Sequence, residues 1–201
     1  MIYITGDTHR DFSRFTRKER DRLLFDLKKG DIVIVCGDFG LLWDKSSTFA
    51  FYLDWLGRLP FQILWVAGNH ENYDMLEEYN CEFWHGGKVR HIVRDKIIYL
   101  ERGQVFKIEG KKIFTFGGAS SHDVQGGILD LADPDYAQKR IAAIQSGLPY
   151  RIKGKSWWWQ ELPTESEMLE YKKWYCGHYH VNRIMDQKHI VLFEEIIPLE
   201  W

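Results

Sequence analysis

Four short polar blocks of the chain carry residue types that bind metal ions. They supply carboxylate, imidazole and amide-oxygen donors, a borderline-hard set that suits manganese, iron, zinc or nickel and differs from a structural thiolate site. A carboxylate that bridges two cations, beside an unligated histidine, would provide an activated hydroxide, charge neutralisation and a proton donor for in-line attack on phosphorus. The blocks are Gly6-Asp7-Thr8-His9, Gly37-Asp38-Phe39-Gly40, Gly68-Asn69-His70-Glu71 and Gly177-His178-Tyr179-His180.

The first three blocks each follow a short apolar run that is rich in β-branched residues. These runs, Ile2–Thr5, Ile32–Cys36 and Ile63–Ala67, are predicted strands. Two amphipathic stretches lie between them, and we predict helices over Arg17–Lys28 and Phe49–Leu59. Strands that alternate with helices indicate a largely parallel sheet.

The spacing of the polar residues fits such a sheet. Asp7, Asp38 and Asn69 stand at intervals of 31 residues, about one strand–helix–strand unit. In an open α/β sheet, ligands bind at the carboxyl ends of the strands. We therefore expect these three residues to become neighbours at one edge of the sheet.

The pattern changes after residue 96. Ile97–Leu100, Val105–Ile108 and Ile113–Phe116 are separated by turn signals and predict a second, mixed or antiparallel sheet. Residues 118–170 form a less regular insert within a single domain of residues 1–201. A helix is expected over Asp135–Gln145 and a closing strand over His189–Ile197.

Composition narrows the function further. Lysine and arginine total 27 against 29 aspartates and glutamates. This balance gives no indication of a broad basic surface for nucleic acid, although nucleic acid remains possible as a substrate. The N-terminal residues lack the pattern of a secretory signal, and no apolar run reaches the roughly 20 residues of a membrane span. We expect a cytoplasmic protein with no membrane association, and the sequence gives no indication of its oligomeric state.

The four blocks, in this order, resemble the calcineurin-like metallophosphoesterase family, whose pattern runs D-x-H, G-D-x-x, G-N-H-[D/E] and G-H-x-H. The resemblance implies an α/β fold, a two-sheet sandwich flanked by helices in four layers. It also implies two divalent metal ions, with manganese foremost and iron, zinc, nickel or magnesium as alternatives. The activity would be that of a phosphatase or phosphodiesterase in which a dimetal-activated hydroxide attacks in line. A phosphorylated small molecule, a nucleotide or a phosphoprotein would be the substrate.

The resemblance also implies a role for each matching residue. Asp7, His9 and His180 would hold the first metal, Asp38 would bridge, Asn69 and His178 would hold the second metal, and His70 would be the leaving-group acid. Arg10, next to His9, is a candidate for neutralising a substrate phosphate through bidentate hydrogen bonds, or a solvated arginine.

One family element is missing from its usual place. The family has a strand that ends in an isolated histidine before the final block, and this histidine is a ligand of the second metal. Here a polar helix, predicted to begin near Thr164 and to cover Glu165–Lys173, leads directly into Trp174. His122 is a candidate replacement ligand, a pocket-lining residue or a solvated loop residue; alternatively, the chain lacks a segment near residues 170–174.

Two other functions remain open. An impaired or non-catalytic binding module with an incomplete second metal site is one, and the missing histidine favours it. A nuclease is the other. The cluster Trp157-Trp158-Trp159 favours it if the rings stack a nucleobase, although such clusters more often pack in a core or lid.

Overall fold

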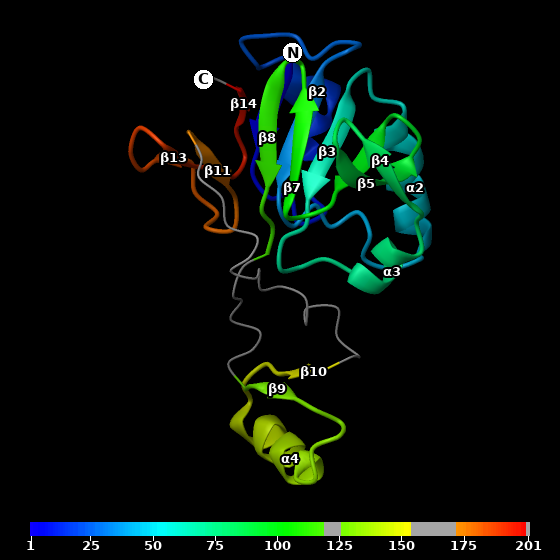
Figure 1. Ribbon diagram of the computed structural model, residues 1–201, viewed down its shortest axis with the longest axis vertical. Helices are drawn as coiled ribbons and strands as arrows, with labels where there is room; N and C mark the ends of the chain where they lie inside the picture. Colours follow the sequence, from blue (N-terminus) through cyan, green and yellow to red (C-terminus); the bar gives the residue numbers. More distant parts are fainter. Residues whose placement is uncertain (119–125, 154–171, 200–201) are drawn as a thin grey trace.

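The computed structural model describes residues 1–118, 126–153 and 172–199. Their main element is a seven-stranded mixed sheet (Figure 1). The four parallel strands β1, β2, β3 and β6 form its centre, and each joins its neighbour in register. The strand order is β14 (Ile196–Pro198), β1 (Ile2–Thr5), β2 (Ile32–Cys36), β3 (Gln62–Val66), β6 (Ile97–Leu100), β5 (Gly87–Val93) and β4 (Cys81–Trp84).

The central strands are buried on both faces, which explains their nearly continuous apolar sequences. Val33, Val35 and Trp65 point to one face and pack against helix residues. Ile34 and Leu64 point to the opposite face. The sheet is therefore the middle layer between two hydrophobic clusters.

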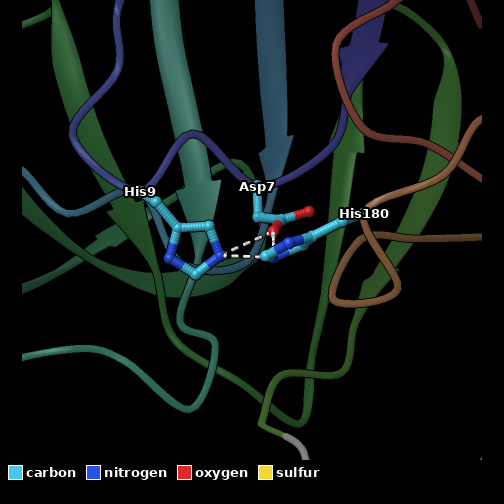
Figure 2. A group of neighbouring side chains, drawn as sticks. All are labelled: Asp7, His9 and His180. Atoms are coloured by element: carbon cyan, nitrogen blue, oxygen red, sulfur yellow. Dashed lines mark hydrogen bonds and ion pairs between the residues drawn. The ribbon is translucent and has the colours of Figure 1, made fainter.

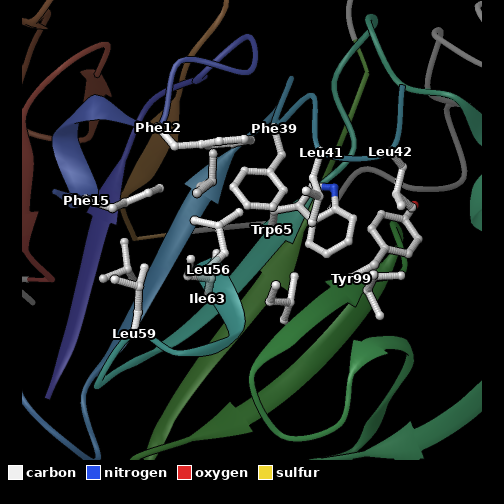
Figure 3. Close-up of a cluster of buried hydrophobic side chains, with 14 of the residues drawn as sticks. Phe12, Phe15, Phe39, Leu41, Leu42, Leu56, Leu59, Ile63, Trp65 and Tyr99 are labelled. Atoms are coloured by element: carbon white, nitrogen blue, oxygen red, sulfur yellow. The ribbon is translucent and has the colours of Figure 1, made fainter. Parts of the chain in front are cut away.

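The first cluster holds the helices against the sheet (Figure 3). Ser46 caps the N-terminus of helix α2 (Ser47–Gly57), and its hydroxyl accepts a hydrogen bond from the Phe49 N–H at 3.3 Å. Its Leu56 is 1% exposed. Helix α3 (Tyr73–Glu77) is short and is capped by Asn72 in the same way.

The predicted helix over residues 17–28 is wrong beyond its first turn. After the 3-10 turn η1 (Ser13–Phe15), α1 extends only over Arg17–Arg20. Leu27 is 6% exposed, whereas Leu24 is fully exposed. Leu24 and Leu27, which we expected on one apolar face of the helix, are therefore not buried together. Leu27 is buried without being part of a helix.

Two smaller sheets contribute side chains to the cluster on the other face of the main sheet. Strands β7 (Gln104–Ile108) and β8 (Lys111–Thr115) form a hairpin, which Figure 1 shows in front of β2 and β3. Strands β11 (Trp174–Cys176), β13 (His189–Val191) and β12 (Arg183–Ile184) form a three-stranded sheet in that order. The fold class is α/β with a large mixed sheet, and the four-layer arrangement stays a prediction.

Two strand assignments from the sequence need correction. Ile97–Leu100 joins the main sheet beside β3 and not the second sheet, because its four residues are all buried. The predicted strand over residues 189–197 divides into β13 and β14, which belong to different sheets. The chain bends between them at Phe193, whose N–H donates to Asn182 Oδ1 at 2.7 Å.

The insert contains β9 (Ile128–Leu129), α4 (Tyr136–Ser146) and β10 (Arg151–Ile152). The helix was predicted to within one residue at each end, and Gly147 ends it with a φ of 67°. The single-domain assignment stays a prediction, and the expected polar helix near residue 164 lies outside the described residues. Within the part of the chain that the structure describes, no helix is long and apolar enough to cross a membrane.

Candidate metal centre

The candidate site lies where three neighbouring parallel strands end. Asp7 follows β1, Asp38 follows β2 and Asn69 follows β3. Their relative exposures are 0%, 2% and 1%. Burying three polar side chains together costs free energy unless each has a partner. The buried groups at this edge of the sheet therefore need hydrogen bonds or a bound cation.

Backbone and side-chain hydrogen bonds connect the loops that carry these residues. The His9 N–H donates to the Asp38 carbonyl at 2.8 Å, and the His178 N–H donates to Asp7 Oδ1 at 3.0 Å. Glycine permits the last contact, because a Cβ on Gly177 would lie 2.6 Å from Asp7 Oδ1. The first and last blocks of the chain are thus brought into direct contact.

One group of three donor atoms converges closely (Figure 2). Asp7 Oδ2 lies 2.7 Å from His9 Nε2 and 2.9 Å from His180 Nε2. The two imidazole nitrogens are 2.9 Å apart. Among the described residues, this is the group of histidine, cysteine or acidic side chains whose geometry could hold a metal ion.

The donor atoms fit a divalent cation. Two ligands at right angles on one cation, with bonds of about 2.1 Å, are about 3 Å apart, close to the separations observed here. Asp7 Oδ2 is also buried and accepts no hydrogen bond of good geometry. A cation would satisfy this oxygen and the two imidazole lone pairs together.

Electrostatics favour a charged carboxylate at this position. Burial raises the pKa of Asp7, but contact with His9 and the hydrogen bond from the His178 backbone outweigh it, so the pKa falls below its usual range. The contact with Asp7 raises the pKa of His9, which burial partly opposes. The contact therefore favours the negative form of Asp7 and the positive form of His9 together.

A second set of side chains lies beside the first. Asp38 Oδ2 is 3.7 Å from His9 Nε2, so Asp38 borders the first group, and its Oδ1 accepts the His70 N–H at 2.7 Å. His178 Nδ1 and Asn69 Oδ1 are 3.0 Å apart. Asn69 Nδ2 is buried without a hydrogen-bond partner. This second set therefore offers a carboxylate, an amide oxygen and an imidazole next to the first group.

Backbone strain is concentrated at the site. Five residues other than glycine have left-handed backbone angles here, a conformation that costs about 1–3 kcal/mol for each residue and typically occurs at functional sites. The residues are His9 (φ 45°), Arg10 (68°), Asp38 (41°), His178 (72°) and His180 (48°).

His70 and Glu71 occupy different environments. His70 is half-buried, and its ring centroid lies 5.6 Å from that of His9. Glu71 is buried and accepts the Phe39 N–H at 2.9 Å. Burial, with a contribution from Asp38, raises the pKa of Glu71 to about 8. Glu71 therefore supports the loop that carries Asp38, a role that the sequence did not indicate.

Arg10 lies at the rim of the site. Its guanidinium contacts Asp44 at 3.4 Å and Ser46 Oγ at 3.3 Å. Both partners precede α2, so Arg10 connects the loop that carries Asp7 and His9 to the start of that helix. Its role toward a substrate phosphate stays a prediction.

Sequence analysis missed two residues that support the first group. Arg14 donates to the carbonyl oxygen of Asp7 at 3.0 Å and to that of Phe193. The Phe193 ring stacks on His180 with centroids 4.8 Å apart and an interplanar angle of 13°. No local pattern marks either residue, because both act through contacts between opposite ends of the chain.

Two sequence predictions fall on parts of the chain that the structure leaves undescribed. His122, the candidate replacement ligand or substrate-pocket residue, lies within residues 119–125, and the tryptophan cluster lies within residues 154–171. The alternatives for both stay as predictions.

The fold and the converging donors are those of a metal-dependent phosphoesterase. Comparison with known families agrees, since the sequence model of the calcineurin-like phosphoesterases matches residues 1–182. The chain belongs to the calcineurin-like phosphoesterase family. Comparison with curated proteins returned no match.

Proposed function

We propose that the chain is a phosphoester hydrolase, a phosphatase or phosphodiesterase that uses two divalent metal ions. The observation that carries this proposal is the convergence of Asp7, His9 and His180 beside Asp38. Asp7, His9 and His180 would hold the first cation. Asp38 would serve both cations, and Asn69 and His178 would hold the second.

The bound cations, with manganese the foremost candidate, would neutralise the phosphoryl oxygens and activate water for in-line attack on phosphorus. The chain itself supplies buried carboxylates and more exposed imidazoles, on loops that hydrogen bonds tie to one another. Fixed donors lower the cost of reorganisation when charge develops during the reaction.

His70 is proposed to donate the proton to the leaving group. It follows Asn69 directly, and its backbone is fixed by the hydrogen bond to Asp38. Its ring lies beside that of His9 and remains half-buried, so it is accessible to a substrate. A histidine in this position can act as a general acid near neutral pH.

Mutation of Asp38 and His70 tests the proposal. Asp38→Asn and His70→Ala are each expected to reduce hydrolysis of an aryl phosphate or aryl phosphodiester at least a hundredfold. His85→Ala is the matched control, because His85 is exposed and contacts the Lys107 carbonyl. Full activity in either site variant, with folding verified by circular dichroism, would contradict the proposed roles.

A non-catalytic or impaired relative is a second candidate, and the small number of donors in the second group favours it. Asn69 and His178 contact each other, and with Asp38 they offer three donors among the described residues. Metal analysis after dialysis distinguishes the two. About two equivalents of manganese or iron with hydrolysis support the enzyme, whereas one or none without hydrolysis supports the binding module.

Comparing single-stranded DNA with small nucleotides as substrates tests the nuclease.

A further inference from the structure

A polar pocket of about 650 Å³ opens beside the candidate metal centre. His9 lines this pocket and also belongs to the first group of donors, with Asp7 and His180. A molecule whose phosphoryl group lies at the candidate metal centre can therefore extend its remaining atoms into the pocket. We call it the rim pocket, and its other lining residues are Arg10, Asp11, Asp44, Ser46, Thr48 and Tyr52.

The helix side of the rim pocket supplies two hydroxyl groups. Thr48 and Tyr52 are four residues apart on α2, so they lie on the same face of that helix. The Tyr52 ring packs against the buried Phe12 ring, with centroids 4.8 Å apart, and remains half-buried. Neither hydroxyl has a hydrogen-bond partner within the described part of the chain. Both hydroxyls can therefore donate to a bound molecule and accept from it.

The loop side of the rim pocket adds charged groups that hydrogen bonds position. The Arg10 guanidinium contacts Asp44 at 3.4 Å and Ser46 Oγ at 3.3 Å. The Ser46 N–H donates to Asp44 Oδ1 at 3.0 Å. Asp11 supplies a second carboxylate, and its Oδ1 accepts the Ser13 N–H at 2.9 Å. One guanidinium and two carboxylates therefore line the pocket together with the hydroxyl groups.

The chemistry of this lining selects the kind of group that fits the rim pocket. Two carboxylates against one guanidinium disfavour a second phosphate or carboxylate on the ligand. An aliphatic or aryl group would cover these polar side chains without forming hydrogen bonds to them, which costs free energy. A group with several hydroxyls fits better, because each hydroxyl both donates and accepts, and the lining offers partners of both kinds.

We propose that the rim pocket binds the sugar, or a related polyol, of a phosphate ester whose phosphoryl group lies at the candidate metal centre. This inference rests on the proposed hydrolysis. In that reaction water attacks phosphorus, the bond from phosphorus to the sugar oxygen breaks, and this oxygen leaves as a hydroxyl after taking up a proton. Asp11 and Asp44 accept hydrogen bonds from the sugar hydroxyls, and Arg10 donates to them. Thr48 and Tyr52 can do both.

Calorimetry with analogues that cannot be hydrolysed tests the rim pocket without turnover. A hexose phosphonate, in which a methylene group replaces the ester oxygen, is compared with its cyclohexyl counterpart, which has a similar shape without hydroxyls. With the whole chain and manganese present, the hexose phosphonate should bind at least about tenfold more tightly. The double variant Thr48→Val with Tyr52→Phe should reduce this preference at least about fivefold, because two hydroxyl partners are lost. Tyr136→Phe, on α4 and outside the pocket lining, is the matched control and should keep the preference.

Hydrolysis of an aryl phosphate and an aryl phosphodiester, measured on the same samples, tests the proposed function separately. Three results would overturn the assignment of the rim pocket: equal binding of the two phosphonates, full preference in the double variant, or tighter binding of a zwitterionic serine phosphonate than of the hexose phosphonate. Any of these together with aryl ester hydrolysis refutes the sugar site alone. A preference for the hexose phosphonate without hydrolysis of any ester refutes the hydrolase and supports the pocket as a sugar site.

Discussion

Glu71 provides a quantitative test of the electrostatics beside the candidate metal centre. Its side chain is 3% exposed, and burial with a contribution from Asp38 raises its pKa from 4.5 to about 8. At 1.36 kcal/mol per pKa unit, ionising this carboxyl in the folded chain costs about 5 kcal/mol more than in the unfolded chain. Glu71→Gln removes the ionisation and nearly preserves the shape.

The sign follows from proton binding. The folded chain holds the Glu71 proton more tightly than the unfolded chain, so its contribution to stability is complete below pH 4.5 and is lost as pH rises to about 8. The free energy of unfolding of the original chain should therefore fall relative to that of Glu71→Gln across this interval, by up to about 5 kcal/mol.

Urea unfolding at a series of pH values, in the presence of a chelator, measures this difference. Other titrating groups such as His9 are common to both proteins and largely cancel. Glu77→Gln is the matched control, because Glu77 is exposed on α3 and its replacement should give a parallel curve. If the Glu71→Gln curve is also parallel to that of the original chain, the buried, protonated state assigned to Glu71 is wrong.

Three further predictions concern the support of the first metal group. Phe193→Ala should weaken manganese binding about 10–100-fold by calorimetry, because it removes the ring that stacks on His180, whereas Phe193→Tyr should retain binding. Gly177→Ala should lower both manganese affinity and melting temperature, since its Cβ would press on Asp7; unchanged values would contradict that close contact. Arg14→Met should destabilise the chain by about 2–4 kcal/mol in urea unfolding, because carbonyl groups of two loops lose their donor.

The sequence predicted the elements whose patterns are local. β1 and β2 were predicted to the residue and β3 to within one, because strands buried on both faces are nearly continuous apolar runs. The α1 prediction failed because periodic leucines indicate a helix only when one face buries them all. The hairpin of β4 and β5 was missed, since every residue of β4 is exposed or half-buried and the strand lacks a continuous apolar signal.

For the candidate site, the sequence by itself determined which chemical groups are available and which strand ends carry them. Asp7, Asp38 and Asn69 had to lie near one another once three parallel strands were predicted. The family resemblance implied that His180 joins Asp7 from the far end of the chain, and the tertiary structure has the two side chains in contact. Only the tertiary structure decided that Arg14 and Phe193 support this contact. Local sequence encodes the strands and their terminal loops, but contacts between distant segments depend on how whole sheets pack, and no short pattern records that packing.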